Sequence, residues 1–505
     1  METGRVAPML TAAIFLPLAG AVLLGARRDL EARTARLFAI AVAVVPVALM
    51  AVAWARFQPG PDFQLIEAVP WIPTLGVAYR VGVDGLSLPL AALTALLFLG
   101  SIAYPVDRKG RAAEYYAVFL FLEFASLGVF LALDLFLFYV FWDLSLVGMY
   151  FLIGVWGHGE RARRAALKFF LYTLAGSLVM LLAILGLYLS TEPRTFDMAE
   201  IIRQRPLAGA GLQASLVFLG FAIGFGIKTP LVPVHTWLPP AHVDAPAPAS
   251  TILAGVLLKM GTYGFVRISL SMMPESFRRY ALPLAILAVI SIVYGALVAL
   301  AQPNLKRRIA YSSVNHMGYA ILGIAAAAAV AVGAEAARAL ALTGAIVEMI
   351  AHGFITGALF LITGSIWERA NTYELDEFGG LGTRAPALAG AMGLAAFASL
   401  GLPGLAGFVA EFQIFVGTFS VYPLLAGIGL IGILITAALF LLMLQRIFFG
   451  ELPDRWSEWP RLRPAETWPL ALLLVFVVAI GVVPAPLLAV IQPTVDAMIQ
   501  LLAAP

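Results

Sequence analysis

A lysine lies in a segment that is long and apolar enough to cross a lipid bilayer. Lys228 closes the run 212–228, and Pro230, Pro233 and His235 follow it closely. A charge at bilayer depth costs about 2.5 kcal/mol or more. Prolines interrupt helices, and interrupted backbone at this depth is tolerated only inside protein or beside a water-filled cavity. The combination indicates a path for ions, with His235 as a secondary candidate on it.

Asp143 is the acid that we expect to pair with Lys228. It lies in the apolar run 135–154, and no basic residue near it in the sequence neutralises it. An ion pair would keep both groups charged, whereas separation would favour loss of the Lys228 proton, because burial disfavours the charged amine. The pair would therefore act as a switch. The alternative is a static ion pair that only fixes helix packing.

Lys259 is a second lysine in the middle of an apolar run, and Tyr263 follows one turn later on the same helical face. A lysine can release its proton when it is buried, whereas an arginine remains charged. This choice favours proton transfer over anion binding. The alternative is a lysine near a span end whose amine reaches the interface.

Two histidines continue the polar pattern. His316 follows Ser312 and Ser313, and His352 lies four residues after Glu348, which places each set on one helical face. A neutral imidazole both donates and accepts a hydrogen bond, so it can relay protons. Taken singly, each histidine is more often a satisfied core residue. As members of a line of polar residues, the two histidines favour the proton relay.

Glu411 follows a second interrupted run, in which Pro403 lies among glycines in the segment 397–411. We expect Glu411 to release protons to the outer side. Glu123 is a further acid within an apolar run, and we expect it to link to a neighbouring subunit. The alternative for Glu123 is a capping or packing role.

The composition is that of a membrane protein. The 505 residues are 62% hydrophobic and 12% charged, and the formal net charge of +3 requires no nucleic-acid partner. The mean hydropathy is +0.95. The absence of cysteine excludes disulfides and cysteine-ligated iron–sulfur clusters. Five histidines are present, but the sequence surroundings of each argue against a haem ligated by two of them. No segment has the pattern of a nucleotide-binding loop or a metal-ligand cluster.

Apolar windows predict about fourteen transmembrane helices. The first runs from Ala7 to Gly25, which we interpret as a span and not as a signal peptide because no small-residue cleavage site follows it. The predicted centres lie near residues 16, 46, 95, 123, 145, 178, 222, 257, 290, 320, 353, 400, 433 and 477.

Basic residues gather in the connections after odd-numbered spans, roughly twenty against roughly nine after even spans, so these connections are predicted to be cytoplasmic. Both chain termini then lie on the outer side. A miscounted span would invert part of this topology. The basic residues after odd spans are Arg27, Arg28, Arg33, Arg36, Arg108, Lys109, Arg111, Arg161, Arg163, Arg164, Lys168, Lys306, Arg307, Arg308, Arg369, Arg384, Arg446, Arg455, Arg461 and Arg463.

The two interrupted runs predict an inverted-repeat architecture, because paired broken helices in two halves of a chain are typical of transporters. We expect one all-α polytopic membrane domain, 1–505, with discontinuous helices at spans 7 and 12. Residues 1–110 would form N-terminal helices, 111–271 the first five-helix repeat (spans 4–8), 277–450 the second (spans 9–13), and 451–505 a C-terminal helix.

One long motif resembles a known family. The segment 235–246, His-Thr-Trp-Leu-Pro-Pro-Ala-His-Val-Asp-Ala-Pro, and the following lysine-bearing run 250–264 are similar to the signature of the subunit M (chain 4) family of respiratory complex I, the proton-pumping NADH:quinone oxidoreductase. Segments 135–154, 304–318 and 399–411 resemble the same antiporter-like family in order and spacing, so the resemblance covers nearly the whole chain.

The resemblance implies a proton channel of fourteen helices with inverted five-helix repeats. Asp143 and Lys228 would form the inlet pair; Lys259, His316 and His352 the central polar axis; and Glu411 the outlet. Four positions depart from the family pattern. Asp143 stands for a glutamate, Gly148 for a proline, Pro240 for an acid and Glu348 for an uncharged amide. Because aspartate is one methylene shorter, a water can bridge Asp143 to Lys228 where direct contact fails.

The expected function is proton translocation coupled to quinone reduction elsewhere in a complex I-type enzyme. NADH, FMN, iron–sulfur clusters and quinone would belong to partner subunits, and this chain would hold no cofactor. The expected partners are the lipid bilayer and the other membrane subunits, including the lateral helix of subunit L, in a bacterial inner membrane. The alternatives are an Mrp-type cation/proton antiporter subunit and a membrane subunit of a hydrogenase or ferredoxin-linked relative.

Overall fold

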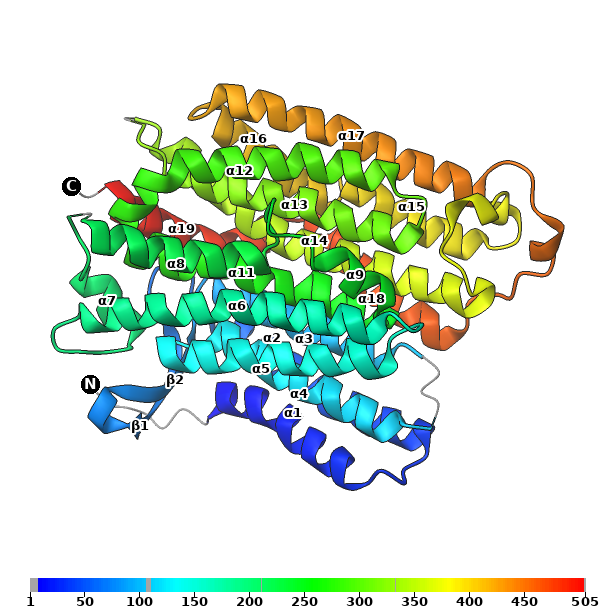
Figure 1. Ribbon diagram of the computed structural model, residues 1–505, viewed down its shortest axis with the longest axis horizontal. Coiled ribbons are helices and arrows are strands. Elements are labelled where there is room, and N and C mark those ends of the chain that lie inside the picture. Colours follow the sequence, from blue (N-terminus) through cyan, green and yellow to red (C-terminus); the bar gives the residue numbers. More distant parts are fainter. Residues whose placement is uncertain (1–7, 106–109, 210, 332, 504–505) are drawn as a thin grey trace.

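The computed structural model describes residues 8–105, 110–209, 211–331 and 333–503. Arg108 and Lys109, counted above among the basic loop residues, lie outside the described residues. The fold is a bundle of helices that run side by side along the long axis (Figure 1). Eleven helices in the described part are long and apolar enough to cross a membrane by length and composition. The exact count of fourteen spans therefore stays a prediction.

The first half of the bundle contains the following helices: α1 (Met9–Ala26), α2 (Ala32–Arg56), α3 (Ser87–Ala103), α4 (Ala112–Leu131), α5 (Leu135–Trp156), α6 (Ala162–Leu189), α7 (Met198–Gln204), α8 (Leu212–Lys228), α9 (Leu238–Asp244), α10 (Ala247–Ile252) and α11 (Leu258–Gly264). Two π-helical segments, η2 (Leu253–Leu257) and η3 (Phe265–Leu270), flank α11 and join it to α10 and to the end of its span.

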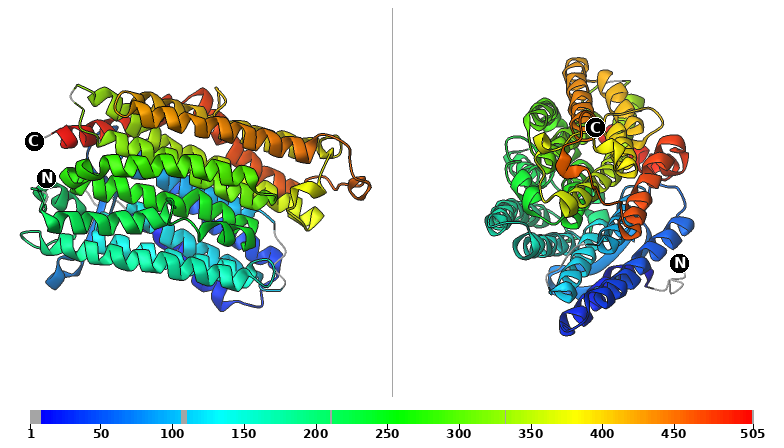
Figure 2. Two further views of the ribbon diagram at one scale, coloured as in Figure 1. Left: turned by 45° about the horizontal axis from the view of Figure 1, so that its top comes forward. Right: turned by 90° about the vertical axis from the view of Figure 1, so that its right-hand side faces the viewer.

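The second half contains α12 (Pro274–Ala301), α13 (Leu305–Ala327), α14 (Glu335–Ala370), α15 (Pro386–Ser399), α16 (Ala406–Phe419), α17 (Pro423–Phe448), α18 (Pro464–Val482) and α19 (Ala485–Ala503). α14 is the longest of them, with 36 residues, and the window that qualifies it as a membrane span is completely buried. α14 thus forms the centre of the molecule and carries two of the predicted site residues. The view along the bundle shows the helices packed around this interior (Figure 2).

Both predicted helix breaks are present. The first separates α8 from α9 at residues 229–237, where Trp237 Nε1 donates a hydrogen bond of 2.9 Å to the Ile227 carbonyl and ties the two halves together. The second separates α15 from α16 at residues 400–405. Gly401 (φ +78°) and Gly404 (φ +89°) adopt left-handed backbone there, which glycine reaches without strain.

Three features were not predicted. A two-stranded antiparallel hairpin, β1 (Gln64–Ile72) and β2 (Val77–Val83), occupies the connection between α2 and α3, with Val69 opposite Tyr79. The π-helical segments around Lys259 were not foreseen. The single C-terminal span proves to be two helices, because Pro484 has no backbone N–H to continue α18, and α19 begins after it.

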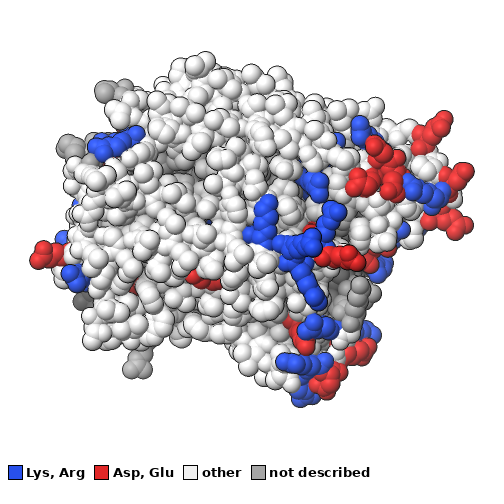
Figure 3. Space-filling view, viewed as in Figure 1, with Lys and Arg blue, Asp and Glu red and all other residues white. Residues whose placement is uncertain are grey.

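Charged residues are distributed unequally between the two ends of the bundle. α1 begins and α19 ends toward the left of Figure 1, whereas the blue and red side chains gather toward the right of Figure 3, and the surface between is almost free of charge. Many leucines point outward from this surface, among them Leu171 and Leu182 on α6, which are 55% and 69% exposed. An uncharged belt with exposed leucines is the surface expected of an integral membrane protein.

Candidate functional site

The first of two buried polar clusters surrounds Lys228, the last residue of α8. Lys228 is 1% exposed, and its amine donates a long hydrogen bond of 3.4 Å to Ser145 Oγ on α5. It also lies 5.0 Å from the centre of the Trp142 ring, close enough for a cation–π interaction. The helix dipole favours a cation at this C-terminal position, which explains in part how the fold tolerates the charge.

Asp143 does interact electrostatically with Lys228, as the sequence predicts. In the described residues, however, no carboxylate oxygen lies within 4.0 Å of the Lys228 amine. Asp143 Oδ1 is buried without a hydrogen-bond partner, and the carboxylate interacts with Tyr139 one turn earlier on α5. Asp143 and Lys228 are therefore not in direct contact, and their role as an inlet pair stays a prediction.

The second cluster centres on Lys259, which is completely buried on α11. Its amine donates a hydrogen bond of 2.6 Å to the Ala254 carbonyl and lies 2.5 Å from Nδ1 of His352 on α14. Ala254 belongs to the π-helical segment η2. Single π-helical turns frequently mark functional sites, and this one places a backbone carbonyl within reach of the lysine.

His352 leads on to His316 of α13, whose ring centre lies 5.4 Å away. His316 Nε2 is within 2.9 Å of Ser399 Oγ on α15, and its Nδ1 faces two carboxylates. Glu348 Oε1 is at 3.2 Å and Glu411 Oε1 at 3.8 Å. Four helices, α11, α13, α14 and α16, thus bring Lys259, His352, His316, Glu348 and Glu411 into one buried polar line, although their positions span more than 150 residues of sequence.

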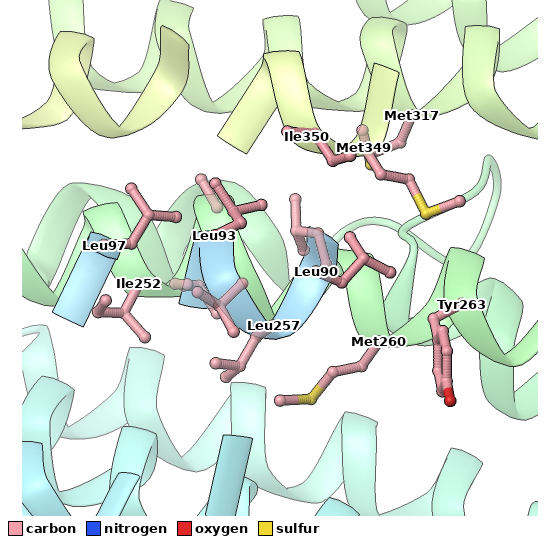
Figure 4. Close-up of a cluster of buried hydrophobic side chains, with 14 of the residues drawn as sticks. Leu90, Leu93, Leu97, Ile252, Leu257, Met260, Tyr263, Met317, Met349 and Ile350 are labelled. Atoms are coloured by element: carbon pink, nitrogen blue, oxygen red, sulfur yellow. The ribbon is translucent and has the colours of Figure 1, made fainter. Parts of the chain in front are cut away.

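A cluster of buried apolar side chains comes partly from the helices that carry this line. Figure 4 shows Leu90, Leu93, Leu257, Met349 and Ile350 packed together from α3, η2 and α14. Met260 and Ile350 are sequence neighbours of Lys259 and His352, so the relay groups and the apolar layer come from the same helices. In such surroundings a charge interacts more strongly with its partners than it would in water.

Several predicted residues lie outside the line. Tyr263 is buried, but its hydroxyl donates to the Phe130 carbonyl at 3.2 Å and accepts from Arg267 Nε at 3.2 Å, so it belongs to a different network. That network ends in an ion pair of 2.5 Å between Arg267 and Asp84, both 2% exposed. The expected role of Tyr263 beside Lys259 therefore has no contact to support it.

His235 and Glu123 are also buried apart from the line. His235 packs against the rings of Tyr294 and Tyr311, at 5.4 and 6.2 Å between ring centres. Its Nδ1 has no hydrogen-bond partner in the described residues. Glu123 on α4 is completely buried, and neither carboxylate oxygen has a partner in the described part of the chain. No hydrogen bond joins Lys228 to Lys259 among the described residues, so the two clusters are separate in this conformation.

Sequence reasoning missed two further residues. His242 on α9 is fully buried and stacks on Phe360 at 4.5 Å, and neither ring nitrogen has a hydrogen-bond partner in the described residues. It interacts electrostatically with Lys259 and with Lys306. Lys306, expected in an exposed basic loop, is completely buried in the first turn of α13, where it donates to the Ala245 carbonyl and faces the Tyr373 ring at 5.4 Å.

The signals for these two residues differ. His242 stands seven positions after His235 in the same Pro-rich motif, and that motif already indicated broken helix. Lys306 has no such signal, because Lys306-Arg307-Arg308 has the composition of an exposed loop. Together they extend the polar residues from Lys259 toward the charge-rich end of the bundle. No group of three or more His, Asp or Glu side chains within the described ranges is arranged to hold a metal ion.

The fold and this line of buried titratable residues define a polytopic membrane protein of the antiporter-like class. Residues 132–436 match the family described as NADH:quinone oxidoreductase/Mrp antiporter, TM. The chain belongs to this family, and within it to the chain 4, or subunit M, type.

Curated relatives agree with this assignment. The chain is 39% identical to NAD(P)H-quinone oxidoreductase chain 4 1 of Nostoc sp. over 94% of its own length and 88% of the relative. It is 42% identical to NAD(P)H-quinone oxidoreductase chain 4 2 of Trichodesmium erythraeum over 88% of its length and 78% of the relative.

Solved structures share the fold. A chain of respiratory complex I from Thermus thermophilus with bound NADH superposes with a TM-score of 0.88 and 31% identity, covering 98% of this chain and 100% of that one. A chain of the Mrp complex from Dietzia sp. superposes with a TM-score of 0.82 over 96% of this chain and 52% of that chain. At 24% identity, this second likeness concerns the fold alone.

Proposed function

We propose that this chain translocates protons as an antiporter-like membrane subunit of an NADH:quinone oxidoreductase. The observation that carries the proposal is the buried line from Lys259 through His352 and His316 to Glu411. Its two ends have contacts of 2.5 Å and 3.8 Å, and the two imidazole ring centres between them lie 5.4 Å apart. Every member exchanges a proton by its ordinary chemistry. A line of such groups across an apolar bundle serves proton transfer better than it serves stability, because buried ion pairs are weak stabilisers.

The Asp143–Lys228 cluster would act as the inlet and Glu411 as the outlet. In this proposal, movement of Asp143 toward or away from Lys228 changes how readily the lysine holds its proton, and Lys259 receives it in a second conformation that brings the clusters together. The two breaks support this step, because the backbone directly after Lys228 and at residues 400–405, directly before the helix that carries Glu411, is not held by continuous helical hydrogen bonds. The repeats 111–271 and 277–450 would move as the two halves.

The redox chemistry would occur in other subunits. The sequence has no cysteine to ligate an iron–sulfur cluster, which supports the placement of the clusters in partner chains, and FMN and the quinone site would lie there as well. The partners would be the neighbouring membrane subunits, with the lateral helix of subunit L along one flank. We further propose a bacterial inner membrane, with both termini on the outer side and the charge-rich end in the cytoplasm.

The test is a purified complex reconstituted into liposomes that carries either Lys228→Ala or Asp143→Ala. Proton uptake and NADH:quinone activity are measured together, and assembly is checked by native electrophoresis. Assembled complexes with severely reduced pumping and reduced quinone-linked activity are expected. A normal proton-to-electron ratio in both variants would overturn the proposal. Cation/proton exchange driven by an ion gradient without NADH would instead support the Mrp-type alternative.

A further inference from the structure

A basic pocket opens at the charge-rich end of the bundle, outside the polar line. Arg161, Arg164 and Lys168 at the start of α6 line it together with Arg307 of α13, around a cavity of about 320 Å³. Asp244 at the end of α9 completes the lining. Figure 3 shows a group of blue side chains on this part of the visible face, immediately beside the uncharged belt.

The lining carries a surplus of positive charge. Asp244 interacts electrostatically with Arg161 and Arg307, but it also interacts with the buried Lys306, so one carboxylate serves three cations. In the described residues, no carboxylate oxygen lies within 4.0 Å of any of the four lining cations. Lys168 Nζ donates 2.7 Å to the Thr236 carbonyl, which fixes its position without neutralising it. The pocket therefore suits an anion.

The cations continue into an apolar stripe on the same helix face. Arg164 and Lys168 are one turn apart on α6, and Leu171, Leu178 and Leu182 follow at helical spacing on that face. These leucines are 55%, 50% and 69% exposed. A small soluble anion would contact only the cations and not the leucines. A molecule with a negative head and a hydrocarbon tail would contact both parts at once.

We propose that this pocket binds the headgroup of an anionic membrane phospholipid, with an acyl chain along the leucine stripe of α6. Basic pockets between transmembrane helices at the cytoplasmic surface are suited to phospholipid headgroups. Arginine guanidinium groups bind phosphate with two parallel hydrogen bonds, and three of the four cations are arginines. The inference rests on the proposed orientation, with this end of the bundle in the cytoplasm, and does not rest on the proposed proton pathway.

The experiment uses the intact purified complex in lipid nanodiscs. Retention of phosphatidylglycerol and of cardiolipin is measured by native mass spectrometry after delipidation and titration, with phosphatidylcholine as the neutral lipid. The test variant is Arg161→Gln/Arg164→Gln/Arg307→Gln. The matched control is Arg163→Gln, because Arg163 is exposed in the same helical turn but does not line the pocket.

The triple variant should bind anionic lipid less tightly by about fivefold for each cation removed, whereas Arg163→Gln should bind it as the parent does. Equal loss in both would overturn the proposal, since it would indicate general surface charge. Equally effective competition by soluble glycerol phosphate would also overturn it, because the acyl chain would then contribute nothing. A thiol introduced by Arg164→Cys could also be labelled in the lipid-free complex. If that thiol is protected from labelling, another subunit covers the pocket and the proposal is overturned.

Discussion

The side-chain nitrogen of Lys259 lies 2.5 Å from Nδ1 of His352, although the two residues are 93 positions apart in the sequence. A hydrogen bond this short requires one nitrogen to donate and the other to accept, so the pair shares a proton. With Lys259 as the donor, Nδ1 of the neutral imidazole accepts, and the ring proton is carried on Nε2. That nitrogen has no partner among the described residues, so onward transfer requires a conformation or a bridging water that supplies an acceptor.

Replacement of Lys259 tests whether a releasable proton is needed. Lys259→Met keeps the length of the side chain and removes the proton, and Lys259→Arg keeps a charge that cannot be released. Both variants should assemble and lose proton pumping by about tenfold or more, as expected when a proton-transfer group is removed. Proton uptake by liposomes with the reconstituted complex provides the measurement. Full pumping in the arginine variant would show that Lys259 serves only as a fixed charge.

The two acids that face His316 should not be equivalent. Glu348 is nearer, at 3.2 Å, but the resemblance implies an uncharged amide at this position, whereas Glu411 lies in α16, the helix that follows the second break. Glu348→Gln should retain pumping within about threefold, since an amide oxygen still accepts from His316. Glu411→Gln should lose it by about tenfold or more, as for other removed proton-transfer groups.

The same proton-uptake assay compares the two variants, and Gln413→Glu gives a control for a changed charge near Glu411. The opposite ranking, with Glu348→Gln inactive and Glu411→Gln active, would assign the outlet to Glu348. Equal loss in both would show that proton transfer needs both carboxylates.

Sequence reasoning located the individual polar residues but not all of their contacts. Charged residues and prolines within apolar runs can be recognised from the sequence alone. Each of them is unfavourable in a bilayer, so its presence indicates a function. The sequence therefore identifies the buried polar residues Lys228, Lys259, His316, His352 and Glu411. It also predicts both helix breaks, which the structure confirms. The shared face of Glu348 and His352 was predictable from helical spacing alone.

Tertiary contacts decided the rest. Tyr263 was expected beside Lys259, but its hydroxyl contacts Arg267. Both residues lie four positions from Tyr263, so helical spacing alone does not distinguish between them. Lys306 was expected in a loop because its neighbours are arginines, yet the Ala245 carbonyl and the Tyr373 ring bury its amine. The distance between Asp143 and Lys228 depends on how α5 packs on α8, which no local pattern determines.

The reach of Asp143 leads to a direct prediction. Asp143→Glu adds one methylene, which should bring a carboxylate oxygen into contact with Lys228 in place of the present electrostatic interaction over a longer distance. We expect the Asp143→Glu variant to keep proton pumping. A structure of the variant should show a carboxylate oxygen within ion-pair distance of the Lys228 amine. Asp143→Asn, which is nearly isosteric but uncharged, should lose pumping severely. Retained pumping in Asp143→Asn would mean that the charge of this residue is not part of the inlet.

The buried pair of Asp84 and Arg267 is expected to contribute to stability and not to transport. Removal of one partner of a buried ion pair leaves an uncompensated charge and costs about 3–5 kcal/mol. Asp84→Asn should therefore lower the thermal stability of the purified complex, and Asp84→Leu/Arg267→Met should recover much of it. Differential scanning fluorimetry in detergent would measure both. Unchanged stability of Asp84→Asn together with lost pumping would instead place the pair on the transport route.

The second helix break positions Glu411 through Gly401. A Cβ at Gly401 would lie 2.5 Å from Glu411 Oε2, and the residue has φ +78°, which other residues rarely adopt. Gly401→Ala should therefore push the carboxylate away from His316 and reduce pumping several-fold, while the rest of the bundle stays folded. Gly393→Ala is the matched control on α15, because a Cβ there meets nothing within 4 Å. Proton uptake in both variants, with assembly checked on native gels, is the measurement. Equal proton pumping in Gly401→Ala and Gly393→Ala would show that pumping does not depend on the position of Glu411 beside Gly401.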